Sequence, residues 1–419
     1  MRVDPPFRSA RSGLLEIEHA SQDDWMLPCQ QGAARGRAAR SVLLFTLLLA
    51  GCPKQTIKES PPLADNVAVV DRDGRIGMIA ELRSEVLTSY ERDEPPEIES
   101  SMIAPQIGTI RVGVGPGDIL LNEELERAPS RWPLDVPPAT PTEARSKRLE
   151  IHLAQDASAA WASDEISWRI NMCGRTAVIP LRMTSLFARD GDRWVLVFEH
   201  LSFGRSPAPV RDGKLRGKTL KDARIDPDIH DALSRVLAPV LTRSIAKSPN
   251  LISTGPESLI IGPDVTDEWQ GPGVLDARVA AGNLRAEDRR VGVVGRRVET
   301  ATMAYWVGNF VADLPARPGV AAGKVRLRGT FVFEKRRDQK VQANQKTKPL
   351  ENCSKRLSDE DEEKNPCRWI LVQGHMSQSI DDGPDPDPTK RDYVDLASIV
   401  FGTSLISPKP LEFTCEETK

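Results

Sequence analysis

The sequence contains few of the residues that build catalytic and metal sites. It has five histidines, three tyrosines and six cysteines among 419 residues. Six cysteines are few for a disulfide scaffold. Outside residues 336–367, no histidine and cysteine stand at the spacing of a zinc site. We therefore expect neither a bound metal nor a cofactor.

An excess of charge of one sign is also missing. The chain has 57 basic and 60 acidic residues, for a net charge of −3, and it lacks the broad basic field of a nucleic-acid-binding protein. The apolar share of 39% and the charged share of 28% are typical of a soluble body. The length leaves room for two or three domains, each with its own core.

Long apolar runs are missing too, and the clearest short one lies near the amino terminus. Residues 42–50 form an apolar core after the basic stretch that begins at Arg35. A membrane-spanning helix needs about 20 apolar residues, so this core suits a signal peptide instead. The sequence Leu49-Ala50-Gly51-Cys52 follows it and resembles the lipobox of bacterial lipoproteins. In that family the cysteine thiol takes a diacylglycerol, and the peptide is cut just before it.

This resemblance implies that the protein is held in the bacterial cell envelope by lipid on Cys52. Residues 1–51 are then the signal region, with Met26 as an alternative start, and residues 52–74 are a lipidated tether. Several acyl chains anchor a protein firmly. Pro53 stands where aspartate is associated with inner-membrane retention, which favours the outer membrane and the periplasm. The alternative is a chance apolar run beside a buried cysteine.

An internal repeat organises the rest of the chain. The segment 193–202 (RWVLVFEHLS) matches 368–377 (RWILVQGHMS) at an offset of 375 − 200 = 175. Upstream, Arg182-Met-Thr matches Arg328-Gly-Thr at an offset of 146, and Trp161 aligns with Trp306 at 145. One insertion at about 336–367 explains the jump in offset. A tandem duplication of a domain-sized unit is the simplest account.

Each copy is expected to begin with a helix and to end with three strands. Apolar residues recur every three or four positions at 79–90 and at 228–246, which predicts helices. In the first copy, strands are expected at 148–170, 177–189 and 193–203, with a hairpin turn at Asp190-Gly191. Simple alternation places Trp194, Leu196, Phe198, His200 and Ser202 on one face of the last strand.

These strand motifs resemble the SnoaL-like branch of the nuclear transport factor 2-like superfamily. The family implies an α+β fold of two tandem cone-shaped domains, each a strongly curved, mostly antiparallel sheet wrapped around N-terminal helices. The expected organisation is a first SnoaL-like domain at 75–205, a linker at 206–226, a second domain at 227–380 with the insertion, and a tail at 381–419.

His200 and His375 are the candidate catalytic residues, because histidine can act as a general base. The alternative is a buried histidine whose ring nitrogens bond neighbouring strands. No convergent set of acids and bases accompanies either residue in the sequence. Four tryptophans are candidates to line a ligand cavity, or else simply belong to the core: Trp161, Trp194, Trp306 and Trp369.

Cys353 and Cys367 are expected to form a disulfide, because the mature protein is exported and the bond closes the insertion. The leading functional hypothesis is a non-catalytic envelope lipoprotein that binds a small apolar ligand or a partner protein. The rival is a SnoaL-like isomerase, cyclase or hydrolase with His200 or His375 as general base. A third reading gives the second domain and its insertion a role in an envelope assembly.

Overall fold

The computed structural model describes the chain in segments. The described residues are 71–91, 109–114, 119–121, 142–172, 175–204, 220, 226–278, 283–294, 300–316, 322–337, 353 and 366–378. The predictions for the signal region, for Cys52 and most of its tether, and for the tail after residue 381 fall outside these residues. The expected tether at 52–74 is too long at its end, because a helix already begins at Arg72.

The first half of the chain forms a seven-stranded sheet, here called sheet A. Its strand order is β2-β1-β7-β6-β5-β3, and β4 also pairs with β5. The strands are β1 (Ile110–Val112), β2 (Ile119–Leu121), β3 (Thr142–Ser146), β4 (Glu150–Leu153), β5 (Ala159–Met172), β6 (Arg175–Asp190) and β7 (Arg193–Ser202). Only the pairing of β1 with β7 is parallel. The predicted hairpin turn joins β6 to β7, where Gly191 takes a φ of +67° that glycine adopts easily.

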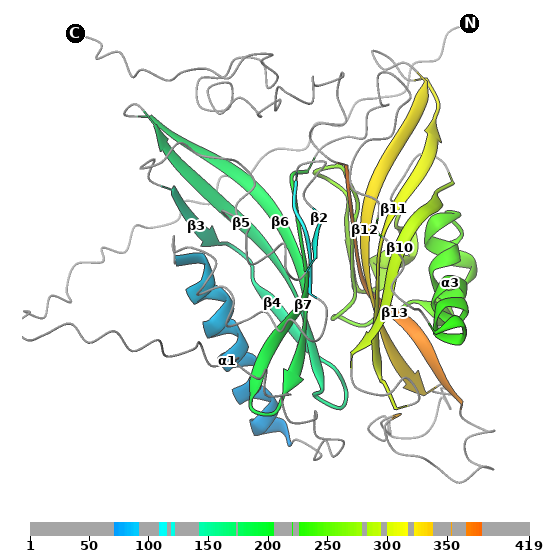
Figure 1. The fold of residues 1–419 in the computed structure, drawn as a ribbon, viewed down its shortest axis with the longest axis horizontal. Helices are drawn as coiled ribbons and strands as arrows, with labels where there is room; N and C mark the ends of the chain where they lie inside the picture. The colour runs from blue at the N-terminus through cyan, green and yellow to red at the C-terminus, as the bar shows by residue number, and fades with distance from the viewer. Residues whose placement is uncertain are drawn as a thin grey trace, which may run out of the picture. The chain divides into compact units, whose positions relative to one another are not determined.

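Helix α1 (Arg72–Glu91) covers one face of sheet A, as Figure 1 shows. Leu82, Val86 and Tyr90 on the helix are buried in one cluster with side chains of β5, β6 and β7. Arg75 fixes the helix to the sheet by donating hydrogen bonds to the carbonyls of Leu153, Ala154 and Gln155. This side of the sheet is called the helix face of sheet A below.

The second half forms a six-stranded sheet, sheet B, in the order β10-β11-β12-β13-β8-β9. The strands are β8 (Leu259–Ile261), β9 (Glu268–Gln270), β10 (Arg285–Val294), β11 (Met303–Leu314), β12 (Gly323–Arg337) and β13 (Cys367–Ser377). Short 3₁₀ turns lie before and after β8 and β9: η3 (Ile245–Lys247), η4 (Pro249–Leu251) and η5 (Gly271–Asp276). Here too only one pairing, β13 with β8, is parallel.

Helix α3 (Pro227–Leu241) packs on the helix face of sheet B. Its amino terminus follows known capping rules, because the Asp226 side chain accepts from two backbone N–H groups and Pro227 opens the first turn. The helix is shorter than the 228–246 predicted from periodicity. It ends at Leu241, since Arg243 adopts a positive φ of 57° that a helix does not allow.

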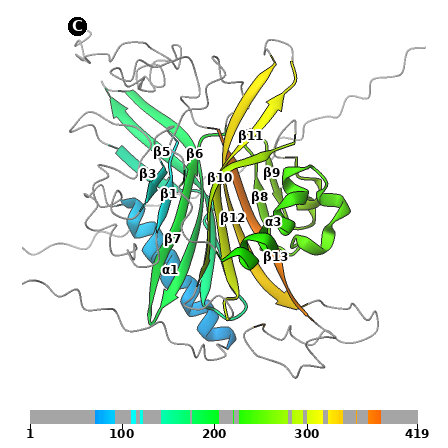
Figure 2. The ribbon, with the colours of Figure 1, turned by 45° about the vertical axis from the view of Figure 1, so that its right-hand side comes forward.

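The remaining faces of the two sheets pack against each other, and all described residues lie in one unit of the chain. Figures 1 and 2 show the sheets side by side, with α1 and α3 on the sides that face away. We call the packed sides the contact faces. One buried cluster joins them. Its members are Ile110, Val112, Ile119, Ala154, Ala159, Trp161, Leu186, Ala188, Val197, Phe198, Leu220, Val294, Met303, Tyr305, Val307, Val332 and Val372.

A β-bulge interrupts the last strand of each sheet at the same place. The β6–β7 register skips Val197, and the β12–β13 register skips Val372. A bulge inserts one residue into a strand, so side chains before the bulge alternate between the two faces in the opposite order from those after it. The prediction that Trp194 shares a face with His200 is therefore wrong. Trp194 lies on the helix face of sheet A, whereas His200 lies in the contact.

The fold is mixed α+β, with two mostly antiparallel sheets, as the sequence indicates. Within the described ranges each sheet carries one α-helix, so the wrapping of each sheet around several helices stays a prediction. No helix among the described residues is both long enough and apolar enough to cross a bilayer.

Candidate functional site

The two candidate histidines stack on each other between the sheets. His200 is on β7 and His375 on β13, their ring centroids are 3.9 Å apart, and the rings are inclined by only 18°. Both side chains are completely buried. They therefore occupy the contact faces rather than the helix face of either sheet.

All four ring nitrogens are hydrogen-bonded to hydroxyl groups of the opposite sheet. His200 reaches Thr330 from Nδ1 at 3.0 Å and Ser377 from Nε2 at 2.7 Å. His375 reaches Thr184 from Nδ1 at 3.0 Å and Ser202 from Nε2 at 2.7 Å. The two halves make identical bonds in opposite directions.

The surroundings keep both rings neutral. Burial lowers the pKa of His200 well below its ordinary value, and the cationic Arg328 and Arg182 lower it further. Burial also lowers the pKa of His375 well below its ordinary value, and His200 and Arg182 lower it further. A general base must be able to reach a proton on its substrate. Neither histidine has a free nitrogen or an approach to one, so the alternative of a buried, strand-bonding histidine describes both.

The arginines of the repeated motif belong to the same contact. Arg182 donates to the carbonyls of Pro263 and Asp264 in the turn after β8. The Asp264 side chain caps that turn by accepting from the backbone N–H of Thr266. The motif Arg-x-Thr, together with His-x-Ser, thus holds the two sheets together.

The four candidate tryptophans lie in three different environments. Trp161 is in the contact and donates to the Glu257 carbonyl of the other half of the chain. Trp194 lies under Arg189, and Trp369 lies under Lys335 in the equivalent place on sheet B, both as cation–π pairs. Trp306 is in the core of sheet B under α3.

The alignment of Trp161 with Trp306 is corrected by the strand registers. Trp161 pairs with Leu186, and Tyr305 pairs with Val332. Leu186 and Val332 both stand next to the bulge, at the offset of 146, so Trp161 corresponds to Tyr305. A slip of one residue moves a strand side chain to the opposite face. That is why Trp161 and Trp306 lie in different cores.

A row of polar residues crosses the helix face of sheet A. Direct pairing sets Ala162 beside Ser185, Ser185 beside Glu199, and Glu199 beside Arg111. Cβ atoms of directly paired residues lie about 5 Å apart. Arg111 and Glu199 form a buried ion pair with a closest N–O distance of 3.7 Å. The Ser185 side chain is fully buried, and its hydroxyl has no hydrogen-bond partner in the described part of the chain.

The equivalent row of sheet B is apolar. It consists of Trp306, Phe331, Gly374 and Ile260 in the same pairing order. A Cβ atom on Gly374 would lie 3.1 Å from the Phe331 ring, so glycine at this position makes room for that ring. Aromatic rings therefore fill the place under α3 where sheet A holds a serine and an ion pair.

Asp164 adds a carboxyl group to the helix face of sheet A. Its Oδ1 accepts from the Ser146 hydroxyl at 3.0 Å and from the Arg148 N–H at 3.1 Å. Its Oδ2 is buried without a hydrogen-bond partner among the described residues. Burial raises the pKa of Asp164, and hydrogen bonds from Ser146, Arg148 and Tyr90 only partly oppose that rise. Perturbed carboxyls of this kind mark candidate functional sites.

This set (Arg111, Asp164, Ser185, Glu199 and Tyr90) is here called the polar row, and the sequence does not reveal it. The sequence points to the histidines, which lie on the opposite face of β7 from Glu199. One signal was present. Glu199 and Ser185 interrupt apolar strands at positions where the second copy has Gly374 and Phe331.

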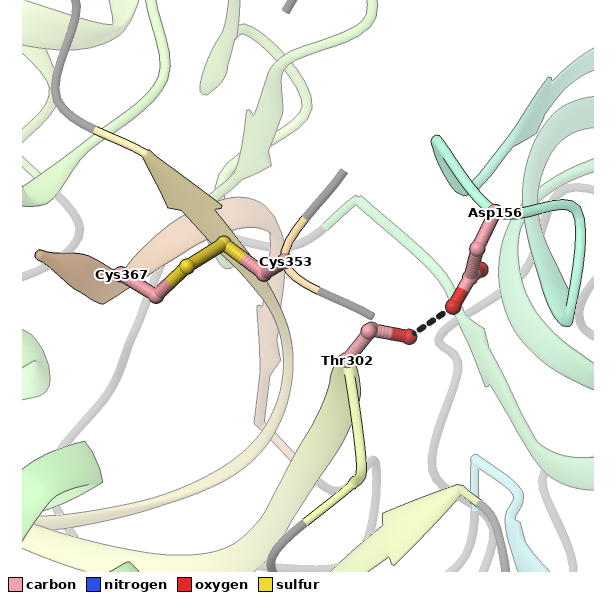
Figure 3. Close-up of a disulfide and its surroundings, with 4 residues drawn as sticks. All are labelled: Asp156, Thr302, Cys353 and Cys367. Atoms are coloured by element: carbon pink, nitrogen blue, oxygen red, sulfur yellow. Dashed lines mark hydrogen bonds between the residues drawn. A yellow bond between two sulfur atoms is a disulfide. The ribbon is translucent and has the colours of Figure 1, made fainter. Parts of the chain in front are cut away.

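No group of three or more metal-binding side chains occurs within the described ranges. Cys353 and Cys367 are joined by a disulfide at the start of β13, which is the pair the sequence favours (Figure 3). Nearby, the Thr302 hydroxyl donates to the Asp156 carboxylate from the other half of the chain. The disulfide and this bond lie among structural contacts. They contribute nothing to the polar row.

Comparison with known proteins identifies part of this architecture. A family model described as a SnoaL-like domain matches residues 112–206. Residues 112–206 form a SnoaL-like domain. The match contains β7 with His200 and most of sheet A. No curated protein is similar in sequence to the chain.

Solved structures that are similar to part of the chain include proteins described as NTF2-like. A putative dehydratase of the NTF2-like family from Streptomyces avermitilis is 14% identical, with 32% of this chain and 100% of that chain covered and a TM-score of 0.26. A putative ketosteroid isomerase from Parabacteroides distasonis is 18% identical, with 30% and 86% covered and a TM-score of 0.22. The association domain of CaMKII from C. elegans is 13% identical, with 36% and 94% covered and a TM-score of 0.22.

Proposed function

We propose that the protein is a lipid-anchored envelope lipoprotein whose SnoaL-like domain binds a small, mostly apolar ligand at the polar row. The observation that carries the proposal is the contrast between the two rows. Sheet A holds Arg111, Ser185 and Glu199 where sheet B holds Ile260, Phe331 and Gly374. Burying the Ser185 hydroxyl without a hydrogen-bond partner among the described residues costs stability. A ligand that supplies the missing hydrogen bonds offsets that cost.

The second half of the chain is, in this proposal, a second SnoaL-like domain with a structural role. Three features support it: the same strand order, a bulge at the equivalent residues Val197 and Val372, and a cationic side chain over each of Trp194 and Trp369. Its helix face is filled by its own rings. It covers the contact face of the first domain instead of binding a ligand.

The ligand environment is amphipathic. Above and below the polar row, the helix face of sheet A carries Met183, Leu201, Phe187 and Leu196, all in one buried cluster. Arg111 and Glu199 compensate each other's charge. A molecule with an apolar body and a single hydroxyl or amide group matches these surroundings, because Asp164 Oδ2 and the Ser185 hydroxyl have no hydrogen-bond partner among the described residues.

In this proposal the histidines are not catalytic, since all four of their ring nitrogens are hydrogen-bonded within the contact. Proton transfer at Asp164 is the second candidate, and the raised pKa of its carboxyl favours it. One variant separates ligand binding from proton transfer at Asp164. Asp164→Asn should keep a bound ligand, whereas an enzyme that uses this carboxyl would lose turnover of that ligand.

The localisation part of the proposal depends on the lipobox at Cys52. Lipidation there would place both domains beside a membrane, with Pro53 favouring the outer one. The apolar ligand would then be taken from, or handed to, that membrane.

Native mass spectrometry of the protein extracted from its own membrane tests ligand binding. The wild type should carry a small molecule that is absent from the triple variant Arg111→Ile, Ser185→Phe and Glu199→Gly. That variant copies three of the four positions of the sheet B row into sheet A, so the introduced ring has a glycine beside it, as Phe331 has Gly374. Phe331→Leu changes only the row of sheet B, and it should keep the ligand. Equal ligand content in the wild type and the triple variant would sink the proposal.

A further inference from the structure

We propose that the contact between the two sheets opens on acidification, with His200 and His375 as the sensing groups. The inference concerns the contact faces and does not depend on ligand binding at the polar row. The two rings stack at 3.9 Å, with one ring supplied by each sheet. Their four hydrogen bonds all cross from one sheet to the other.

The charged groups that act on the rings are cationic. They are Arg182 on β6 and Arg328 on β12, both buried. The carboxylates Asp264, Asp267 and Glu268, from the turn after β8 and from β9, act on Arg182. On β7 and β1, Glu199 and Arg111 lie on the helix face, away from the rings.

The other side chains beside the rings are uncharged. In the row of His200 they are Ser163 on β5, Thr184 on β6 and Val112 on β1. In the row of His375 they are Val307 on β11, Thr330 on β12 and Ile261 on β8.

Among the described residues, no carboxylate acts on either ring to stabilise a proton there. The first proton sets an imidazolium against a stacked neutral ring and two guanidinium groups. The second sets two imidazolium rings 3.9 Å apart in a buried site. Opening the contact exposes both rings to water, where each binds its proton at the ordinary pKa of about 6.5.

The sign of the effect follows from the lowered pKa of both histidines. Above about pH 6.5 the rings are neutral in the closed and the open form, and the contact is fully stable. Below it, only the open form binds protons, so each histidine shifts the equilibrium toward opening by up to about tenfold per pH unit. Together they shift it by up to about a hundredfold per unit.

Opening would uncover an apolar surface. Phe198 and Tyr305 face each other across the contact, with ring centroids 6.2 Å apart. Acidification would thus expose an apolar face that is buried at neutral pH.

Energy transfer between two dyes on the full-length protein tests the inference. Dyes on unnatural residues at Ile76 in α1 and Asp313 in β11 report the separation of the sheets, since both positions are exposed. Transfer should fall between pH 7 and pH 5 with a slope of about two protons. The double variant His200→Gln and His375→Gln should lose this slope, because glutamine bonds hydroxyls but does not titrate. His230→Gln, on α3 outside the contact, should keep it.

If the glutamine double variant fails to fold, a second variant and a second measurement still test the inference. Ser377→Asp places a carboxylate beside His200, and it should move the opening transition to lower pH. In the wild type, deuterium exchange at the imidazole C2 atoms, read by mass spectrometry, reports each histidine's pKa. Titration of His200 and His375 near 6.5 with unchanged energy transfer would overturn the inference. So would a pH-independent wild type, or an unaltered slope in the glutamine variant.

Discussion

Arg182 and Arg328 make the same contact in opposite directions. Arg182 on sheet A donates to the Pro263 and Asp264 carbonyls beside sheet B, and Arg328 on sheet B donates to the Gly113 and Val114 carbonyls beside sheet A. Each guanidinium satisfies two carbonyls in a turn that follows a short parallel strand. The pair therefore closes both ends of a two-fold contact within one chain.

Removing one of these arginines should destabilise the protein strongly. Arg328→Ala leaves two buried carbonyls without donors, and hydrogen bonds from charged donors are worth about 1.5–3 kcal/mol. We expect a loss of about 3 kcal/mol in the free energy of unfolding, measured by urea denaturation. Arg193→Ala is the matched control, because that side chain is 59% exposed. A loss no larger than that of the control would contradict the role of Arg328.

The buried carboxyl of Asp164 should give stability a second pH dependence. Its pKa is raised by burial, so the folded state binds a proton more tightly than the unfolded state does. Stability from this group is therefore lost as the pH rises from its ordinary value of 3.8 through the raised value. Asp164→Asn should be less stable relative to wild type at pH 4 than at pH 7. Urea denaturation at both pH values measures this, with Asp190→Asn in the β6–β7 turn as control.

The disulfide should stabilise the β12–β13 hairpin. Cys353 and Cys367 are 14 positions apart, and closing a loop of about this length contributes about 3 kcal/mol in the chain-entropy model. Replacing both residues by serine should lower the melting temperature as much as reducing the wild type does. If reduction leaves the melting temperature of the wild type unchanged, the bond is not formed in the protein.

Lipidation predicts the behaviour of the Cys52→Ala variant. Without the thiol there is no acceptor for the diacylglycerol, and the protein should appear in the soluble fraction or remain unprocessed. Fractionation and labelling with a radioactive fatty acid measure this, with Cys29→Ala as the matched control. Unchanged labelling of Cys52→Ala would refute the lipobox.

Much of the secondary structure is predictable from the sequence, because alternation and turn residues act locally. The expected strand 193–203 is β7 (Arg193–Ser202), and Asp190-Gly191 marks the turn before it. The face of the sheet on which each side chain lies was harder to predict. The bulge at Val197 depends on how β7 pairs with β6, and no residue within the strand predicts it.

The candidate site was harder to predict for the same physical reason. His200 and Glu199 are neighbours in sequence, yet one lies in the contact and the other on the helix face. Which side carries a helix and which meets another sheet is decided by pairing between distant segments. The repeat revealed equivalent positions, but the meaning of Glu199 beside Gly374 emerged only from the strand registers.

The contact has one further consequence, which comes from its being built within a single polypeptide. In a symmetric homodimer every substitution appears on both sides at once, so a change that favours a ligand on one side is imposed on the other. Here each half varies separately. Sheet A holds the charged Glu199 where sheet B holds Gly374, so the destabilising effect of this buried ion pair arises in one sheet and not in both. Joining the halves also makes their association independent of protein concentration.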